Sequence, residues 1–71
     1  MNHEWYSSLA MALYGKRFRV KDSPLNWGVM QGYRIHSGVG YFIISGRMIR
    51  PDVFDRFWQE VPEEESPENV E

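Results

Sequence analysis

Residue types that perform catalysis occur in this chain, but their spacing matches no catalytic pattern. His3 and His36 lie far apart in the sequence and belong to no metal-binding motif such as His-Glu-x-x-His. No serine has a Gly-x-Ser-x-Gly context, and the glycines at 38–40 lack the Gly-Lys-Ser/Thr of a phosphate-binding loop. The absence of cysteine excludes disulfides and Cys-ligated zinc. We therefore predict a protein that is not an enzyme and that uses no cofactor and no metal ion.

Arginines interleaved with aromatic residues are the one pattern that indicates a binding chemistry. Guanidinium groups bind phosphates or carboxylates, while aromatic rings stack on bases or anchor protein contacts. A protein partner and a nucleic acid are therefore both consistent with the pattern. So is a third interpretation, in which the rings form the core and the arginines are solvated. The candidate binding residues are Trp27, Tyr33, Arg34, Tyr41, Arg47 and Arg50.

Charge is unevenly distributed along the chain. The net charge is −2, yet residues 1–59 contain all eight basic residues and four acidic ones, a balance of +4. Residues 62–71 contain five glutamates, two prolines and no aromatic residue, a composition too polar to form a core. We predict one folded domain over residues 1–61 and a disordered acidic tail over residues 62–71. Such a tail either solubilises the protein or competes for its basic face.

The sequence contains no segment that is long and apolar enough to span a membrane. Its N-terminus lacks the basic region of a signal peptide. A cytoplasmic protein that does not bind membranes is expected.

The first half of the chain is predicted to form one helix and two strands. Residues 3–14 form an amphipathic helix with Asn2 as N-cap, Gly15 as terminator, and Trp5, Leu9 and Leu13 on its apolar face beside Ala10. Residues 16–21 alternate as a half-buried strand with a basic outer face. A turn at 22–26 precedes a second strand at 27–36. There Val29, Gln31, Tyr33 and Ile35 share one face, and Gly32 indicates a bulge or bend.

The second half contains the greatest apolar mass of the chain. Residues 41–50 are predicted to form two short strands around a turn at Ser45-Gly46. Pro51 then begins a helix over residues 51–61, with Asp52 at the positive end of the helix dipole. Phe54, Phe57, Trp58 and Val61 fall on one face of that helix, with Phe57 at the centre of this apolar stripe and expected to be buried.

These elements predict an α+β fold with a small curled antiparallel sheet, an N-terminal helix and a C-terminal helix. In its layout the stretch over residues 14–57 resembles an SH3-like barrel. Three stretches resemble the plasmid-borne type II dihydrofolate reductases in layout: residues 14–21, residues 27–35 and residues 47–57. Small KOW-type nucleic-acid modules share the opening strand and turn. That reductase family has a Val-Gln-Ile-Tyr run where this chain reads Arg47-Met48-Ile49-Arg50, so its activity does not carry over. The resemblance implies a barrel and homo-oligomerisation through it. A winged-helix fold is the alternative, because a strand–turn–strand entering a helix also ends the small excisionases of phages and transposons.

We expect a non-enzymatic binding module that acts on a protein partner through a basic and aromatic sheet face. The alternative is a nucleic-acid-binding accessory protein. In its compact size, lack of cysteine and acidic tail, the chain resembles phage or mobile-element accessory proteins.

Overall fold

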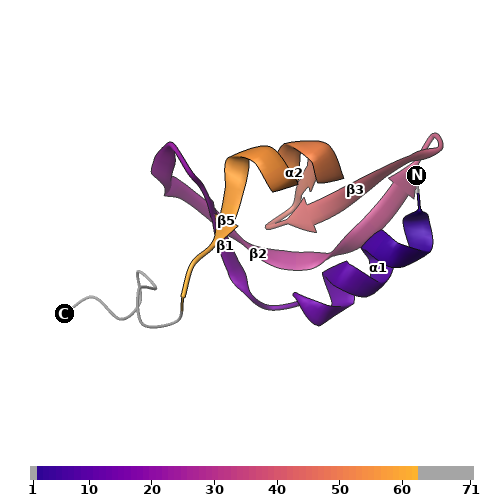
Figure 1. Cartoon of the computed structure of the whole chain (residues 1–71), viewed down its shortest axis with the longest axis horizontal. Coiled ribbons are helices and arrows are strands. Elements are labelled where there is room, and N and C mark those ends of the chain that lie inside the picture. The colour runs from indigo at the N-terminus through magenta and orange to yellow at the C-terminus, as the bar shows by residue number, and fades with distance from the viewer. Residues whose placement is uncertain (1, 63–71) are drawn as a thin grey trace.

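A computed structural model describes residues 2–62 of the chain. Over this range the chain forms two helices and five strands (Figure 1), and the predicted α+β class is confirmed. The predicted acidic tail lies, from residue 63 onward, outside the described residues. In chain order the elements are α1 (His3–Ala12), β1 (Arg17–Val20), β2 (Ser23–His36), β3 (Val39–Ile44), β4 (Arg47–Ile49), α2 (Pro51–Phe57) and β5 (Trp58–Glu60).

The strands form one antiparallel sheet in the order β4-β3-β2-β1-β5. The long strand β2 pairs with β1 through its first half and with β3 through its second half. Within residues 2–62 the two edge strands, β4 and β5, do not pair with each other, so the sheet is not closed into a barrel. Strands also occupy the stretch where a winged helix would have its helix-turn-helix, which argues against that alternative.

A bulge at Gly32 divides β2 into its two halves, as the isolated glycine predicted. The pairing with β3 shifts between Met30 and Gly32, and Gly32 has φ of 144°, which other residues rarely adopt. The extra residue reverses which side chains point inward after it. Val29 and Tyr33 therefore lie on opposite faces, and the single face predicted for Val29, Gln31, Tyr33 and Ile35 is wrong.

Helix α1 begins at His3 as predicted but ends at Ala12, two residues before the predicted end at residue 14. The Asn2 side chain accepts a hydrogen bond from the Trp5 backbone N–H at 3.0 Å, and Gly15 follows the helix with φ of 83°. The buried face differs from the prediction by one position. Tyr6, Leu9, Ala10 and Leu13 pack against the core, whereas the Trp5 side chain is 57% exposed.

Two tight turns connect the strands on either side of β3. Ser37-Gly38 joins β2 to β3, and the predicted turn at Ser45-Gly46 joins β3 to β4. Both residues of each turn have positive φ, between 47° and 85°. That geometry matches the right-handed twist of the paired strands and fixes their register. By contrast, the turn predicted at 22–26 is shorter, because β2 already begins at Ser23.

Helix α2 starts at Pro51 as predicted but ends at Phe57 rather than at residue 61. Its end coincides with the start of pairing to β1: the Lys21 N–H donates to the Phe57 carbonyl at 2.8 Å, and Val20 pairs with Trp58. The strand ladder with β1 thus replaces the last helical turn. As a consequence Trp58 remains buried, but Phe57 is 46% exposed, and the prediction that Phe57 is buried is wrong.

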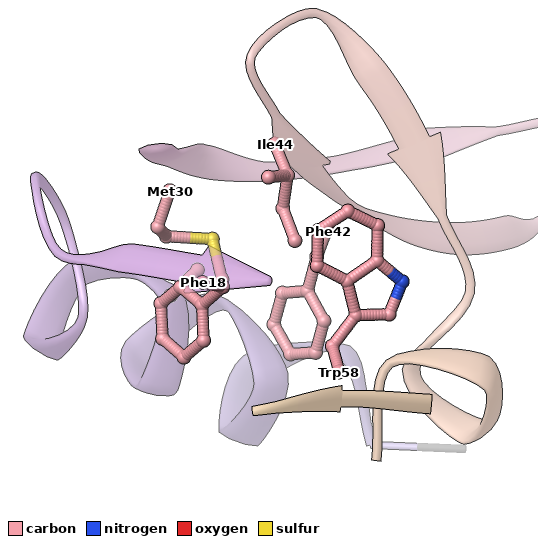
Figure 2. Close-up of a cluster of buried hydrophobic side chains, with 6 residues drawn as sticks. Phe18, Met30, Phe42, Ile44 and Trp58 are labelled. Carbon is pink, nitrogen blue, oxygen red and sulfur yellow. The ribbon is translucent and has the colours of Figure 1, made fainter. Parts of the chain in front are cut away.

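The core lies between the sheet and the two helices. Figure 2 shows Phe18, Met30, Phe42, Ile44 and Trp58 in one cluster, which is completed by Ala10. Phe54 of α2 packs its ring 5.0 Å from Phe18 and 4.8 Å from Phe42, measured between centroids. Aromatic pairs of this kind contribute about 0.5–1.5 kcal/mol beyond the area they bury. They compensate for the small size of the domain.

Gly40 lies directly beneath the ring of Tyr33. A Cβ atom at Gly40 would overlap the Tyr33 hydroxyl and would lie 3.0 Å from Nδ1 of His3. The Tyr33 hydroxyl and that same His3 nitrogen are hydrogen-bonded at 2.7 Å, which ties α1 to β2. Glycine at position 40 therefore allows the Tyr33 ring to cover β3 and reach the helix.

Gly40→Ala should lower the free energy of unfolding by about 1–3 kcal/mol, the usual cost of an overpacked site. The added methyl group must displace the Tyr33 ring and break its bond to His3. Chemical denaturation measures the effect. In a Tyr33→Leu background the same Gly40→Ala change should cost clearly less, since the clashing ring is gone. An equal cost in both backgrounds would show that the Tyr33 contact is not the cause.

Candidate binding surface

The sequence-predicted site residues separate onto different sides of the sheet. Tyr33 points into the protein, where its ring is 5.6 Å from that of Phe42 and 6.0 Å from that of Tyr6. Burial raises the pKa of the Tyr33 hydroxyl above its ordinary value of 10.0, and the neighbouring Tyr6 hydroxyl raises it further. Tyr33 is thus a packing residue that anchors α1, and it does not belong to an exposed face.

Arg34 and Tyr41, by contrast, lie together on the opposite side of the sheet. They are directly paired across β2 and β3, and the neighbouring pairs on the same side are His36 with Val39 and Ile43 with Met48. Arg50 leaves β4 on the side of Met48, because successive residues of an extended chain alternate. We call this surface the outer face; its residues are Arg34, His36, Val39, Tyr41, Ile43, Met48 and Arg50.

The centre of the outer face is apolar and uncovered by the described chain. Along β3 the buried positions are Gly40, Phe42 and Ile44, while Val39, Tyr41 and Ile43 between them are half-buried. Both helices pack on the other face, where Tyr6 of α1 and Phe54 of α2 contact Phe42. Strands that are apolar on both faces usually occur where both faces are covered. The outer side of β3 therefore has the apolar composition of a buried surface, but neither helix within residues 2–62 packs on it.

The rim of the outer face is basic. Arg34, His36 and Arg50 are exposed, and no acidic residue belongs to the outer face. Nε of Arg50 lies 3.6 Å from Oδ1 of Asp52, but both side chains are more than half exposed. An exposed pair of this kind is weak and leaves the guanidinium accessible to a competing carboxylate.

Trp27 belongs to a second group of residues, on β1, the first half of β2, and β5. It pairs with Arg19, while the Arg17 guanidinium carbon lies 5.9 Å from the Trp27 ring centroid. With the Gln59 amide oxygen turned toward β1, Arg19 donates to it from Nε and Nη2, each at 3.0 Å. Two arginines are thus held beside the indole by contacts within the protein.

Arg47 is exposed but does not join the outer face. It pairs with Ile44, whose side chain is fully buried, so Arg47 leaves the edge strand β4 on the core side, beside the Ser45-Gly46 turn. Of the six candidates, the structure therefore brings together Arg34, Tyr41 and Arg50. It places Tyr33, Trp27 and Arg47 elsewhere.

Sequence reasoning missed Val39, Ile43 and Met48, the apolar residues of the outer face. The run from Val39 to Ile44 is apolar at every position, so alternation alone could not separate the core side from the exposed side. The useful signal was the length of that unbroken run in so small a domain, because it exceeds what one buried face requires.

Within residues 2–62, no group of three or more His, Asp and Glu side chains is close enough to hold a metal ion. Over the same range no helix has the length and hydropathy to cross a membrane. Comparison of the chain with protein-family models, with curated proteins and with solved structures found no match.

Proposed function

We propose that the protein is a non-enzymatic binding module whose outer face docks onto an acidic and apolar surface of a protein partner. One observation carries the proposal: β3 is apolar on both sides, yet only one side is covered. The arginines at the rim of the uncovered side make it favour negatively charged groups. Apolar surface at the centre with charge at the rim is the usual arrangement of protein interfaces. The partner should therefore present apolar side chains surrounded by Asp and Glu.

A protein partner fits the outer face better than a nucleic acid does. Stacking platforms for single strands need several exposed rings beside a dense row of cations. The outer face has one aromatic residue, Tyr41, and its other uncharged residues are the apolar Val39, Ile43 and Met48, apart from His36. The nucleic-acid alternative would instead use Trp27 with Arg17 and Arg19. Nucleic-acid binding would be recognised by the logarithm of the affinity, which would fall steeply and linearly with the logarithm of the salt concentration.

Two features support an open form of an SH3-like barrel as the architecture of this module. The long strand β2 contributes to both halves of the sheet, and the short helix α2 returns the chain to β5 beside β1. The resemblance to type II dihydrofolate reductases, which implies homo-oligomerisation, extends the proposal to a second copy as an occupant of the outer face. Sedimentation equilibrium over a wide concentration range separates a self-associating protein from a monomer that awaits its partner. We place that partner in the cytoplasm, in the setting of a phage or mobile element.

Capture from a host lysate with matched baits tests the proposed surface. Met48 is 43% exposed on the outer face, and Met11 is 76% exposed on α1. Met48→Glu should abolish capture, because it adds a negative charge beside Ile43, within a surface that binds acidic groups. Met11→Glu makes the same chemical change on another face and should leave capture intact. Equal capture by both variants would refute the outer face as the binding site.

Removal of residues 63–71 should strengthen binding of an acidic partner. These residues carry five glutamates, so the net charge changes from −2 to +3. Association should accelerate at low salt, since long-range attraction increases with net charge. The thermal midpoint should stay nearly unchanged, because every residue of the core cluster precedes residue 62. A full-length variant with these glutamates changed to glutamine separates charge from length. A fall of several degrees in the midpoint would show that the removed segment packs on the domain.

A further inference from the structure

A second surface with the opposite charge preference lies on the other side of the sheet. It is a groove of about 260 Å³ to which α1, β3 and α2 all contribute. The parts of its lining that matter here are Trp5, Tyr6, Phe42, Phe54, Asp52 and Asp55. Phe42 points to this side, whereas Tyr41 and Ile43, its neighbours in β3, point to the outer face.

The walls of the groove are aromatic, and they are held in place by contacts with one another. Trp5 and Tyr6 are in edge contact with centroids 5.1 Å apart, and Tyr6 meets Phe42 edge-on at 5.9 Å. Phe54 lies 4.8 Å from Phe42 on the α2 side. Only Trp5 is largely open, with 57% of its surface exposed, so the indole can contact a bound group with little rearrangement of the fold.

The charged groups that line the groove are all acidic. Asp52 and Asp55 project from α2, and no Lys, Arg or His side chain contributes to the lining. Arg50 pairs with Asp52 at 3.6 Å, but the pair is exposed and weak, so it leaves the Asp52 carboxylate accessible. Aromatic ring faces and carboxylates both attract a cation, and the combination favours one with an apolar stem.

We propose that this groove binds a cationic side chain, lysine or arginine, presented by a partner polypeptide. The volume supports a single side chain, because pockets for whole small-molecule ligands usually span roughly 300–1,000 Å³. The stem would lie against Tyr6 and Phe54, above the buried ring of Phe42, and the charged head would lie between the Trp5 indole and the two aspartates. The groove and the outer face lie on opposite sides of the sheet and meet at the exposed Arg50–Asp52 pair. The protein therefore has one face for acidic surfaces and another for basic side chains.

Titration of the ¹⁵N-labelled protein with blocked tripeptides tests this proposal by NMR. The probes are Leu-X-Leu peptides, acetylated and amidated, in which X is lysine, arginine, norleucine or glutamate. Norleucine keeps the apolar stem and lacks the charge. The lysine and arginine peptides should shift the Trp5 indole resonance and the amides of residues 51–55. The norleucine peptide should bind at least several-fold more weakly, and the glutamate peptide should not bind.

Two variants identify which side of the groove provides the affinity. Trp5→Ala should lower the affinity for the lysine and arginine peptides about three- to thirtyfold, the range expected for loss of one cation–π contact. The double variant Asp52→Asn with Asp55→Asn should lower this affinity further and remove most of the salt dependence of binding. The matched controls are Met11→Ala on α1 and Asp22→Asn in the turn after β1, both exposed and outside the groove lining.

Three results would overturn the proposal. The first is equal binding of the lysine and norleucine peptides, which would make the groove a purely apolar site. The second is a set of shifts confined to the outer face. The third is the absence of any shift at several millimolar peptide.

Discussion

Phe42→Ala is expected to leave the protein largely unfolded at 25 °C. Phe42 is 1% exposed and contacts the rings of Tyr6, Tyr33 and Phe54, so its side chain connects both helices to β3. Removal of a buried phenylalanine side chain costs about 3–5 kcal/mol. A domain of about sixty residues is marginal, with a total stability near the lower end of about 5–15 kcal/mol. Circular dichroism and NMR dispersion measure the loss.

Phe57→Ala provides the matched control, because it removes the same atoms from a side chain that is 46% exposed. Its backbone carbonyl, which accepts from the Lys21 N–H, remains in place. We expect a cost of roughly 1 kcal/mol and a native-like spectrum. If Phe57→Ala were as destabilising as Phe42→Ala, helix α2 would have to continue past residue 57 and turn Phe57 into the core.

The double charge reversal Arg34→Glu with Arg50→Glu should lower affinity for an acidic partner at least tenfold, or by about 1.4 kcal/mol. Both residues lie at the rim of the outer face, so the loss should come mainly from slower association and should diminish at high salt. Folding should survive, since exposed substitutions usually change stability by less than about 0.5 kcal/mol. Stopped-flow kinetics at several salt concentrations measure the effect.

Arg47→Glu with Arg56→Glu changes the net charge by the same amount at exposed positions outside the outer face. This control should weaken association only slightly, through the overall charge. Equal losses from both double variants would show that net charge alone, and no defined surface, directs the encounter.

Local chemistry made several features predictable from the sequence. Asn2 as a cap, Gly15 as a terminator and Pro51 at a helix start depend on backbone hydrogen bonding and φ, which neighbouring residues decide. The Ser45-Gly46 turn and the alternation of Phe18 with the arginines of β1 are equally local. These predictions are confirmed, except that α1 already ends at Ala12 and Gly15 takes its positive φ in the turn that follows.

Features that depend on distant partners were not predictable in the same way. The helical spacing of Phe54, Phe57 and Trp58 is genuine, but pairing of residues 58–60 with β1 overrides it. On α1, a rotation by one residue replaces Trp5 with Tyr6 as the inward residue, because Phe42 and Tyr33 provide aromatic partners for Tyr6.

The candidate site was predicted only in part for the same reason. Sequence alone could place Arg34 and Arg50 beside strands, but whether they share a face with Tyr41 depends on the register of β2 with β3 and on the bulge at Gly32. That bulge also sends Tyr33 inward. The apolar centre of the outer face became visible only when both helices were seen to pack on the other side of β3.

The most direct test of the outer face is an NMR footprint of the captured partner on the ¹⁵N-labelled protein. The account predicts that amide shifts concentrate at Val39, Tyr41, Ile43 and Met48 and extend to Arg34, and that the Met48→Glu variant shows none of them. A footprint confined to α1, α2 or the Trp27 group, or one that persists unchanged in Met48→Glu, would contradict it.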